Sequence, residues 1–129
     1  MCAEPFMMIN DLGLTFGRAN ALNTNDGASV NFERWSKTAI WKDAGHCIGN
    51  IEQSVTRTLD HPAIGEAGRA FLADLLMQLS DAQLYDLFDV AQFPLRSLGV
   101  NPTRPMTTVE QWVEAFKEKR GEIVNHSCA

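Results

Sequence analysis

Residues 66–91, with the sequence EAGRAFLADLLMQLSDAQLYDLFDVA, decide the fold class of this chain. In the first half, large apolar side chains recur every three or four positions, which is the spacing of one face of an α-helix. They are Phe71, Leu72, Leu75, Leu76 and Leu79. Ser80 and Gln83 then match a capping box, so one helix should end and another begin there. The stretch predicts a helical hairpin within residues 60–93.

Both ends of this hairpin carry start and stop signals. Pro62 suits a first helical turn, where Asp60 or His61 could cap the helix. The second helix should end by Pro94. Its inward side chains are expected to be Leu84, Leu87, Phe88 and Ala91.

A second helical region follows a connector at residues 94–106, which contains Pro102 and Pro105. Thr107 and Glu110 form another capping-box pattern, which predicts a last helix at residues 107–125. Its apolar stripe comprises Val109, Trp112, Val113, Phe116, Ile123 and Val124. Its solvent side should carry Glu114, Lys117, Glu118, Lys119 and Arg120.

Residues 1–59 show no long helical period. Residues 6–10 are a strand candidate, and residues 28–32 alternate weakly and could pair with them. The remainder is predicted to be a long irregular segment, which contains Trp35 and Trp41. We expect these tryptophans to anchor the segment to the core, with ligand stacking as the alternative. The fold class is therefore mainly α, as one domain over residues 1–129, with a short N-terminal strand or hairpin, the helical hairpin and a C-terminal helix.

Bulk properties exclude several functions. The chain has 129 residues, 45% of them hydrophobic, and a formal net charge of -5 with scattered Lys and Arg. A nucleic-acid surface needs clustered basic residues, so we expect no nucleic-acid partner. No apolar run approaches the roughly 20 residues that span a bilayer, so no membrane partner is expected. The first residues lack the pattern of a secretory signal, which predicts a cytoplasmic protein.

The reactive side chains are dispersed. Cys2, Cys47 and Cys128 lack the short spacing of a zinc knuckle, and we expect ordinary thiols in a reducing cytosol. A bridge across the fold, such as Cys47 with a terminal cysteine, is the alternative. The histidines show no metal spacing, which favours surface or capping roles; they are His46, His61 and His126. The serines lack the context of a hydrolase nucleophile.

Asp11 is the one candidate for chemistry. It follows the apolar run at residues 6–10 and precedes Leu12 and Gly13. The simple interpretation is a strand that ends on an acid. The alternative is a metal ligand, because Asp-Leu-Gly after a strand resembles the Asp-Phe-Gly segment of protein-kinase-like folds. In those folds the aspartate holds the Mg²⁺ that bridges nucleotide phosphates.

A wider set of segments resembles a group of uncharacterised bacterial proteins. The segments are residues 11–17, 35–43, 65–76, 79–83 and 86–88, with Trp112, Val113, Phe116, Lys117, Lys119 and Arg120. Longer members carry a kinase-like segment upstream. The resemblance implies that this chain is the C-terminal part of a kinase-like phosphotransferase, inactive alone, which would hold Mg²⁺ only with a missing upstream portion. The competing hypothesis is a non-catalytic helical interaction or scaffold module.

Overall fold

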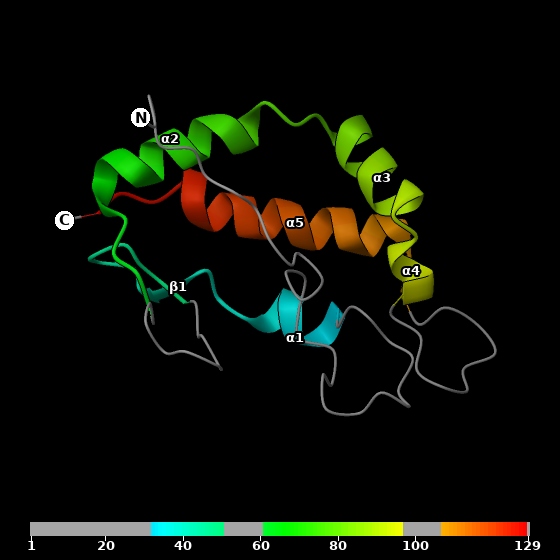
Figure 1. The fold of residues 1–129 in the computed structure, drawn as a ribbon, viewed down its shortest axis with the longest axis horizontal. Coiled ribbons are helices and arrows are strands. Elements are labelled where there is room, and N and C mark those ends of the chain that lie inside the picture. Colours follow the sequence, from blue (N-terminus) through cyan, green and yellow to red (C-terminus); the bar gives the residue numbers. More distant parts are fainter. Residues whose placement is uncertain (1–31, 51–60, 97–106, 129) are drawn as a thin grey trace, which may run out of the picture.

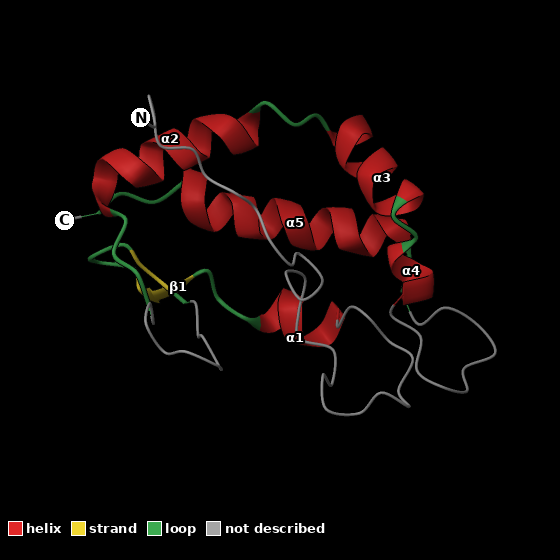
Figure 2. Ribbon diagram, in the orientation of Figure 1, coloured by secondary structure: helices red, strands yellow, loops and turns green. Residues whose placement is uncertain are grey.

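The computed structural model describes residues 32–50, 61–96 and 107–128 of the chain. Within these ranges the prediction of a mainly helical fold is confirmed, and the sheet is one short antiparallel hairpin (Figure 2). The elements in chain order are α1 (Phe32–Lys37), β1 (Trp41–Asp43), β2 (Ile48–Gly49), α2 (Gly65–Met77), α3 (Asp81–Val90), α4 (Phe93–Arg96) and α5 (Val109–Val124).

Helix α5 is the centre of the described structure. Helices α1, α2, α3 and α4 all pack against it. In Figure 1, α2 and α3 lie along one side of α5, and α1 and the hairpin lie along the opposite side. The two helices predicted as a hairpin, α2 and α3, are joined by a short turn, and each packs chiefly on α5. The C-terminal helix therefore organises the fold.

The aromatic core surrounds Trp112 of α5, which is fully buried. The Trp112 ring lies 5.0 Å from the rings of both Phe32 and Phe93 and 5.8 Å from that of Phe88, measured between centroids. Its indole Nε1 donates a 3.1 Å hydrogen bond to Oγ1 of Thr107, so the one polar atom of this buried ring has a partner. Trp112 thereby joins α1, α3, α4 and α5.

The helix starts are partly as predicted. In α3, Ser80 Oγ accepts from the Gln83 amide at 3.2 Å, and Gln83 Oε1 accepts from the Ser80 amide at 2.9 Å, so this capping box is confirmed. In α5 the prediction was wrong by one residue. The box joins Thr108 and Gln111, because Thr107 turns its hydroxyl toward Trp112.

Two local predictions were wrong: that Pro62 belongs to the first turn of α2, and that the connector begins at residue 94. Helix α2 begins at Gly65, whose φ of 67° favours glycine, and no side chain caps its first turn. Pro62 precedes the helix, and the His61 ring contacts the Gly49 carbonyl instead of capping. Pro94 lies inside the short helix α4, where a proline in the first turn loses no helical hydrogen bond.

Burial departs from the sequence pattern at both apolar and charged positions. Phe71, Leu75 and Leu87 were expected to point inward, but they are exposed, because α2 and α3 are each covered on one side only. Conversely, Arg69 and Lys119 are buried, at 9% and 6% exposure. Each has found backbone carbonyls in a distant element, which compensates for the loss of water.

The segment predicted to be irregular contains α1 and the β1–β2 hairpin. Contacts from α5 hold it, since Glu122 Oε2 accepts a 2.8 Å hydrogen bond from the Ile40 amide and the Lys119 ammonium donates to the Thr38 carbonyl. Trp35 packs on Trp112, with ring centroids 5.4 Å apart, which agrees with the anchoring interpretation.

Several predictions lie outside the described residues, namely the strand at residues 6–10, residues 28–31 of its proposed partner, Asp60 as a cap, and most of the connector.

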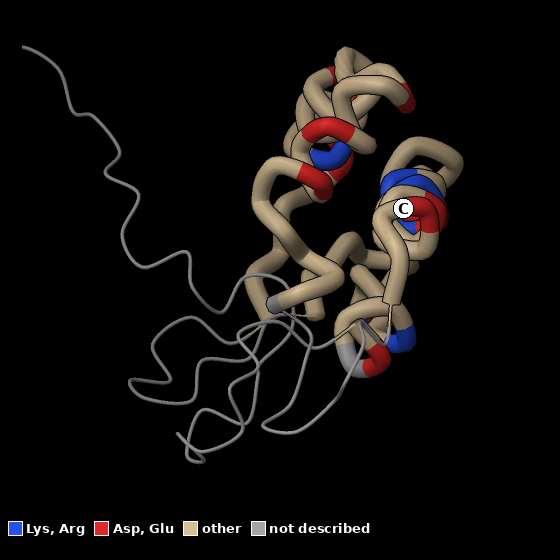
Figure 3. Tube along the Cα trace, turned by 90° about the vertical axis from the view of Figure 1, so that its right-hand side faces the viewer, with Lys and Arg blue, Asp and Glu red and all other residues tan. Residues whose placement is uncertain are grey.

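Figure 3 shows acidic and basic positions next to each other along the helices. Among the described helices, none combines the length and hydropathy that crossing a bilayer requires.

Candidate functional site: the Cys47–Cys128 cluster

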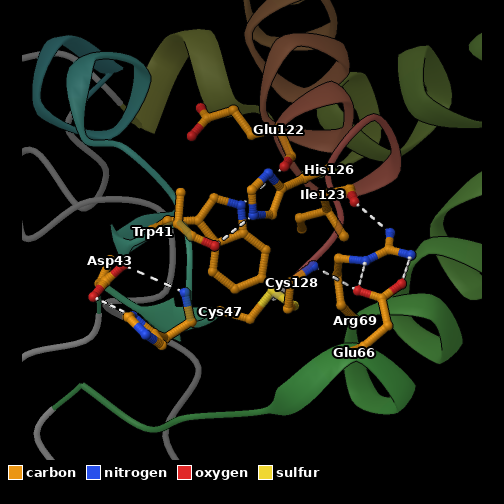
Figure 4. Close-up of a disulfide and its surroundings, with 11 residues drawn as sticks. Trp41, Asp43, Cys47, Glu66, Arg69, Glu122, Ile123, His126 and Cys128 are labelled. Atoms are coloured by element: carbon orange, nitrogen blue, oxygen red, sulfur yellow. Dashed lines mark hydrogen bonds and ion pairs between the residues drawn. A yellow bond between two sulfur atoms is a disulfide. The ribbon is translucent and has the colours of Figure 1, made fainter.

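Three segments far apart in sequence meet at one end of the molecule. They are the turn between β1 and β2, the first turn of α2, and the tail that follows α5 (Figure 4). A disulfide joins Cys47 in the turn to Cys128 in the tail, with Cα atoms 5.5 Å apart. The expectation of free thiols at these two positions was therefore wrong, because the fold brings together cysteines that are 81 residues apart.

The backbone places Cys47 with little freedom. Its φ of 48° is in the left-handed region, and its side chain is fully buried. Its amide donates to the Ala44 carbonyl at 3.1 Å, and its carbonyl accepts from the Ile64 amide at 3.1 Å. The second bond fastens the hairpin to the residue before α2, so Cys47 is positioned independently of the disulfide.

Glu66 and Arg69 form the charged part of the site. Arg69 Nη2 lies 2.5 Å from Glu66 Oε1, Nε lies 2.9 Å from Oε2, and Nη1 donates to the Ile123 carbonyl at 2.8 Å. The backbone amide of Cys128 also donates to Glu66 Oε2, at 2.8 Å. These donors stabilise the carboxylate, above all Arg69, and lower the pKa of Glu66 to about 2.

Trp41 and His126 close the site on the side of the hairpin. The Trp41 indole Nε1 donates to the Glu122 carbonyl at 2.9 Å, and the His126 ring lies 5.7 Å from the Trp41 ring. His126 Nε2 contacts the Ala44 carbonyl, which requires a proton on that nitrogen. These contacts fix the tail between α5 and Cys128.

Of the other two histidines, His46 agrees with a surface role, whereas His61 is half-buried. His46 is exposed, and its Nδ1 lies 2.8 Å from Asp43 Oδ2. This hydrogen bond from His46 is the main reason that the pKa of Asp43 lies below its usual value. His61 contacts the Gly49 carbonyl at 3.3 Å. Within the described residues, no histidine joins a group of metal-ligating side chains.

One such group does occur in the described part of the chain. The ligand atoms of Cys47, Glu66 and Cys128 all lie within 4.8 Å of one another. Sequence spacing could not reveal this group, because its members come from three segments. The sequence held one hint of this group, namely that Cys47 could form a bridge across the fold with a terminal cysteine such as Cys128.

Asp11, the metal ligand suggested by the sequence, lies outside the described residues, and its role stays a prediction. In α3, Asp81 is engaged within the chain. Its Oδ2 lies 3.0 Å from Lys117 Nζ, and its Oδ1 lies 3.9 Å from Arg120 Nη2.

Comparison with protein-family models, curated proteins and solved structures finds no match to this chain.

Proposed function

We propose that the described part of the chain is a non-catalytic interaction module that binds an amphipathic helix of a partner polypeptide along α2. The observation that carries the proposal is an exposed apolar ridge formed by Ile64, Phe71 and Leu75. Phe71 is 67% exposed, which is a large apolar surface to leave in contact with water. We call these three residues the α2 ridge.

The α2 ridge has the geometry of a helix-packing surface. Its members are separated by seven and four residues, so they lie on one face of the helix over roughly 16 Å. Gly68 lies in the same row, between Ile64 and Phe71. The Ile64 side chain lies against Gly68, with its Cβ 3.3 Å from the position that a Cβ of residue 68 would take, so the apolar row is continuous. A continuous row of this kind matches the ridges-into-grooves packing of a second helix.

Contacts along α2 hold the ridge rigid. At the start of the helix, Glu66 binds the Cys128 amide, and in the middle Arg69 binds the Ile123 carbonyl. At the end, Arg120 of α5 donates to the Leu79 carbonyl at 2.9 Å. A preformed surface loses less conformational entropy on binding than a mobile one, which favours affinity.

A displayed library of amphipathic helical peptides tests the proposal. Selected peptides should shift the NMR resonances of Phe71 and Leu75, and Phe71→Ala should weaken their binding at least tenfold. Val90→Ala on α3 is the matched control, because Val90 is apolar and 82% exposed but lies off the α2 ridge. Peptides that bind with unchanged affinity to Phe71→Ala, or that map to another surface, would contradict the proposal.

The second candidate function is the one that the resemblance implies, a C-terminal fragment of a kinase-like phosphotransferase that is inactive alone. The α2 ridge also favours it, since part of a larger lobe would expose the surface that the rest of the lobe covers. Its test is nucleotide and Mg²⁺ binding by a full-length relative. Replacing the residue equivalent to Asp11 by Asn should abolish Mg²⁺ binding, and unchanged binding would refute this candidate.

A further inference from the structure

We propose that the reduced form of this protein binds a thiophilic divalent cation, with Zn²⁺ as the best match, between Cys47 Sγ, Cys128 Sγ and one carboxylate oxygen of Glu66. This inference does not depend on the proposed interaction surface. It starts from the juxtaposition of the three ligand atoms, which all lie within 4.8 Å of one another.

The separations suit a tetrahedral site after a small adjustment. Zn²⁺ lies about 2.3 Å from cysteine sulfur and about 2.0–2.2 Å from a carboxylate oxygen, so neighbouring ligand atoms are roughly 3.5 Å apart. Reduction moves the two sulfur atoms from a covalent bond to a non-bonded separation, which is the direction that a metal requires. Two protein sulfurs and one oxygen would leave the fourth position to water.

The surroundings of Glu66 orient it as a ligand and leave it able to bind. A carboxylate has about four acceptor positions. Arg69 Nε and Nη2 and the Cys128 amide use three of them. The remaining position is on Oε1, because Arg69 Nε and the Cys128 amide both bind Oε2. A metal bond from Oε2 would replace one of these two donors. Hydrogen-bonded partners of this kind hold metal-binding carboxylates in place in other proteins.

The charges of the occupied site would also balance. Two thiolates and one carboxylate carry three negative charges, and the Arg69 guanidinium supplies one positive charge. A divalent cation supplies the remaining two. Without the metal, thiolates at the buried Cys47 and the half-buried Cys128 beside a carboxylate would be unfavourable, so the reduced cysteines should stay protonated until the metal binds.

The site can persist without the disulfide, because other bonds hold its three segments. The Ile64 amide donates to the Cys47 carbonyl, and the Cys128 amide donates to Glu66. Arg69 ties α2 to α5 through the Ile123 carbonyl. None of these bonds involves a sulfur atom.

The chemistry has two balanced steps. A dithiol reductant delivers two electrons and two protons to the disulfide, which becomes two thiols while the reductant forms its own disulfide. The cation then replaces the two thiol protons, which pass to solvent, as Cys47 and Cys128 bind as thiolates. Oxidation to the disulfide and binding of the cation therefore exclude each other.

Co²⁺ is the probe for the test, because its thiolate complexes absorb in the near ultraviolet. The full chain carrying Cys2→Ser is reduced with a phosphine, and its circular dichroism is compared with that of the oxidised protein. Reduced protein should bind one Co²⁺ with charge-transfer absorption from two thiolates, and Zn²⁺ should displace it. The oxidised protein should show no such absorption.

Variants assign the ligands. Cys47→Ser and Cys128→Ser should each remove about half of the charge-transfer intensity, and Glu66→Gln should weaken Co²⁺ binding at least tenfold. Glu33→Gln, an exposed glutamate paired with Lys37, is the control and should leave binding unchanged. Three results would overturn the inference: loss of the native fold on reduction, no thiolate absorption, or equal affinities for wild type and Glu66→Gln.

Discussion

Lys119 of α5 donates a hydrogen bond from Nζ to the carbonyl of Thr38, immediately after the end of α1, although Lys119 is only 6% exposed. The same ammonium lies 3.4 Å from the Ser36 carbonyl and 5.3 Å from the centre of the Trp35 ring. A cation at the carbonyl end of a helix interacts favourably with the helix dipole. A side chain of α5 thus serves as the C-terminal partner of α1.

Replacing Lys119 by Met should release α1 from α5. The substitution keeps the apolar stem but leaves the Thr38 carbonyl without this charged donor, at a cost of about 1–3 kcal/mol in the free energy of unfolding. Urea denaturation followed by tryptophan fluorescence measures it, since Trp35 lies beside the substituted group. Lys37→Met, at an exposed residue of α1, is the control and should change stability by less than about 0.5 kcal/mol.

Trp112 should be the most sensitive core position. Trp112→Ala removes the ring that contacts α1, α3 and α4, and should cost about 3–5 kcal/mol in chemical denaturation. Val90→Ala, at a position 82% exposed, should be nearly neutral. A cost below about 1 kcal/mol for Trp112→Ala would contradict the central role of this ring.

Because of Glu66, the stability of the folded protein should decrease as the pH falls into the acid range. Its pKa in the folded protein is about 2 and the ordinary value is 4.5, so the folded state binds fewer protons than the unfolded state between these values. The stabilisation by Glu66 is fully present above pH 4.5 and is lost as the pH falls toward 2. Thermal unfolding midpoints across this window should fall less steeply in Glu66→Gln than in wild type.

Asp89→Asn is the control for the acid experiment, because Asp89 lies on the exposed side of α3. Its midpoints should follow the wild-type slope. Equal slopes for Glu66→Gln and wild type would show that the Arg69 and Cys128 donors do not stabilise the Glu66 carboxylate in solution.

The disulfide should be a large contributor to stability. A bridge that closes a loop with a separation of 81 residues lowers the entropy of the unfolded chain, which corresponds to roughly 4–5 kcal/mol in the loop-entropy model. The paired variant Cys47→Ser with Cys128→Ser should show most of this loss in denaturant. Peptide mapping without reduction should recover Cys47 linked to Cys128, and a link from Cys2 to either would contradict the pairing.

The helices could be predicted from the sequence because their information is local. Apolar spacing located α2, α3 and α5, and the Ser80 and Gln83 pattern placed the start of α3. The apolar spacing predicted the thirteen-residue helix α2 correctly, but it did not show which apolar side chains of this helix are covered by other elements. Coverage depends on how many neighbours a helix has, and periodicity carries no such information.

The site could not be predicted in the same way. Ile40, Trp41 and Thr38 are held by groups of α5 more than 80 positions away, so no local pattern marks the hairpin. Lys119 was predicted to lie on the solvent side of the last helix for the same reason. The pairing of Cys47 with Cys128 follows from the three-dimensional arrangement. The sequence alone left open whether the cysteines are free thiols or whether Cys47 is bridged to one of the terminal cysteines.

The Cys47–Cys128 bond also changes the covalent topology of the molecule. The chain from 47 to 128 is a closed ring, and residues 1–46 extend from it as a branch. A single protease cut between the two cysteines opens the ring without releasing a fragment. Helices α2, α3, α4 and α5 all belong to the ring, so a nicked molecule would keep its full mass until the sulfur bond is broken.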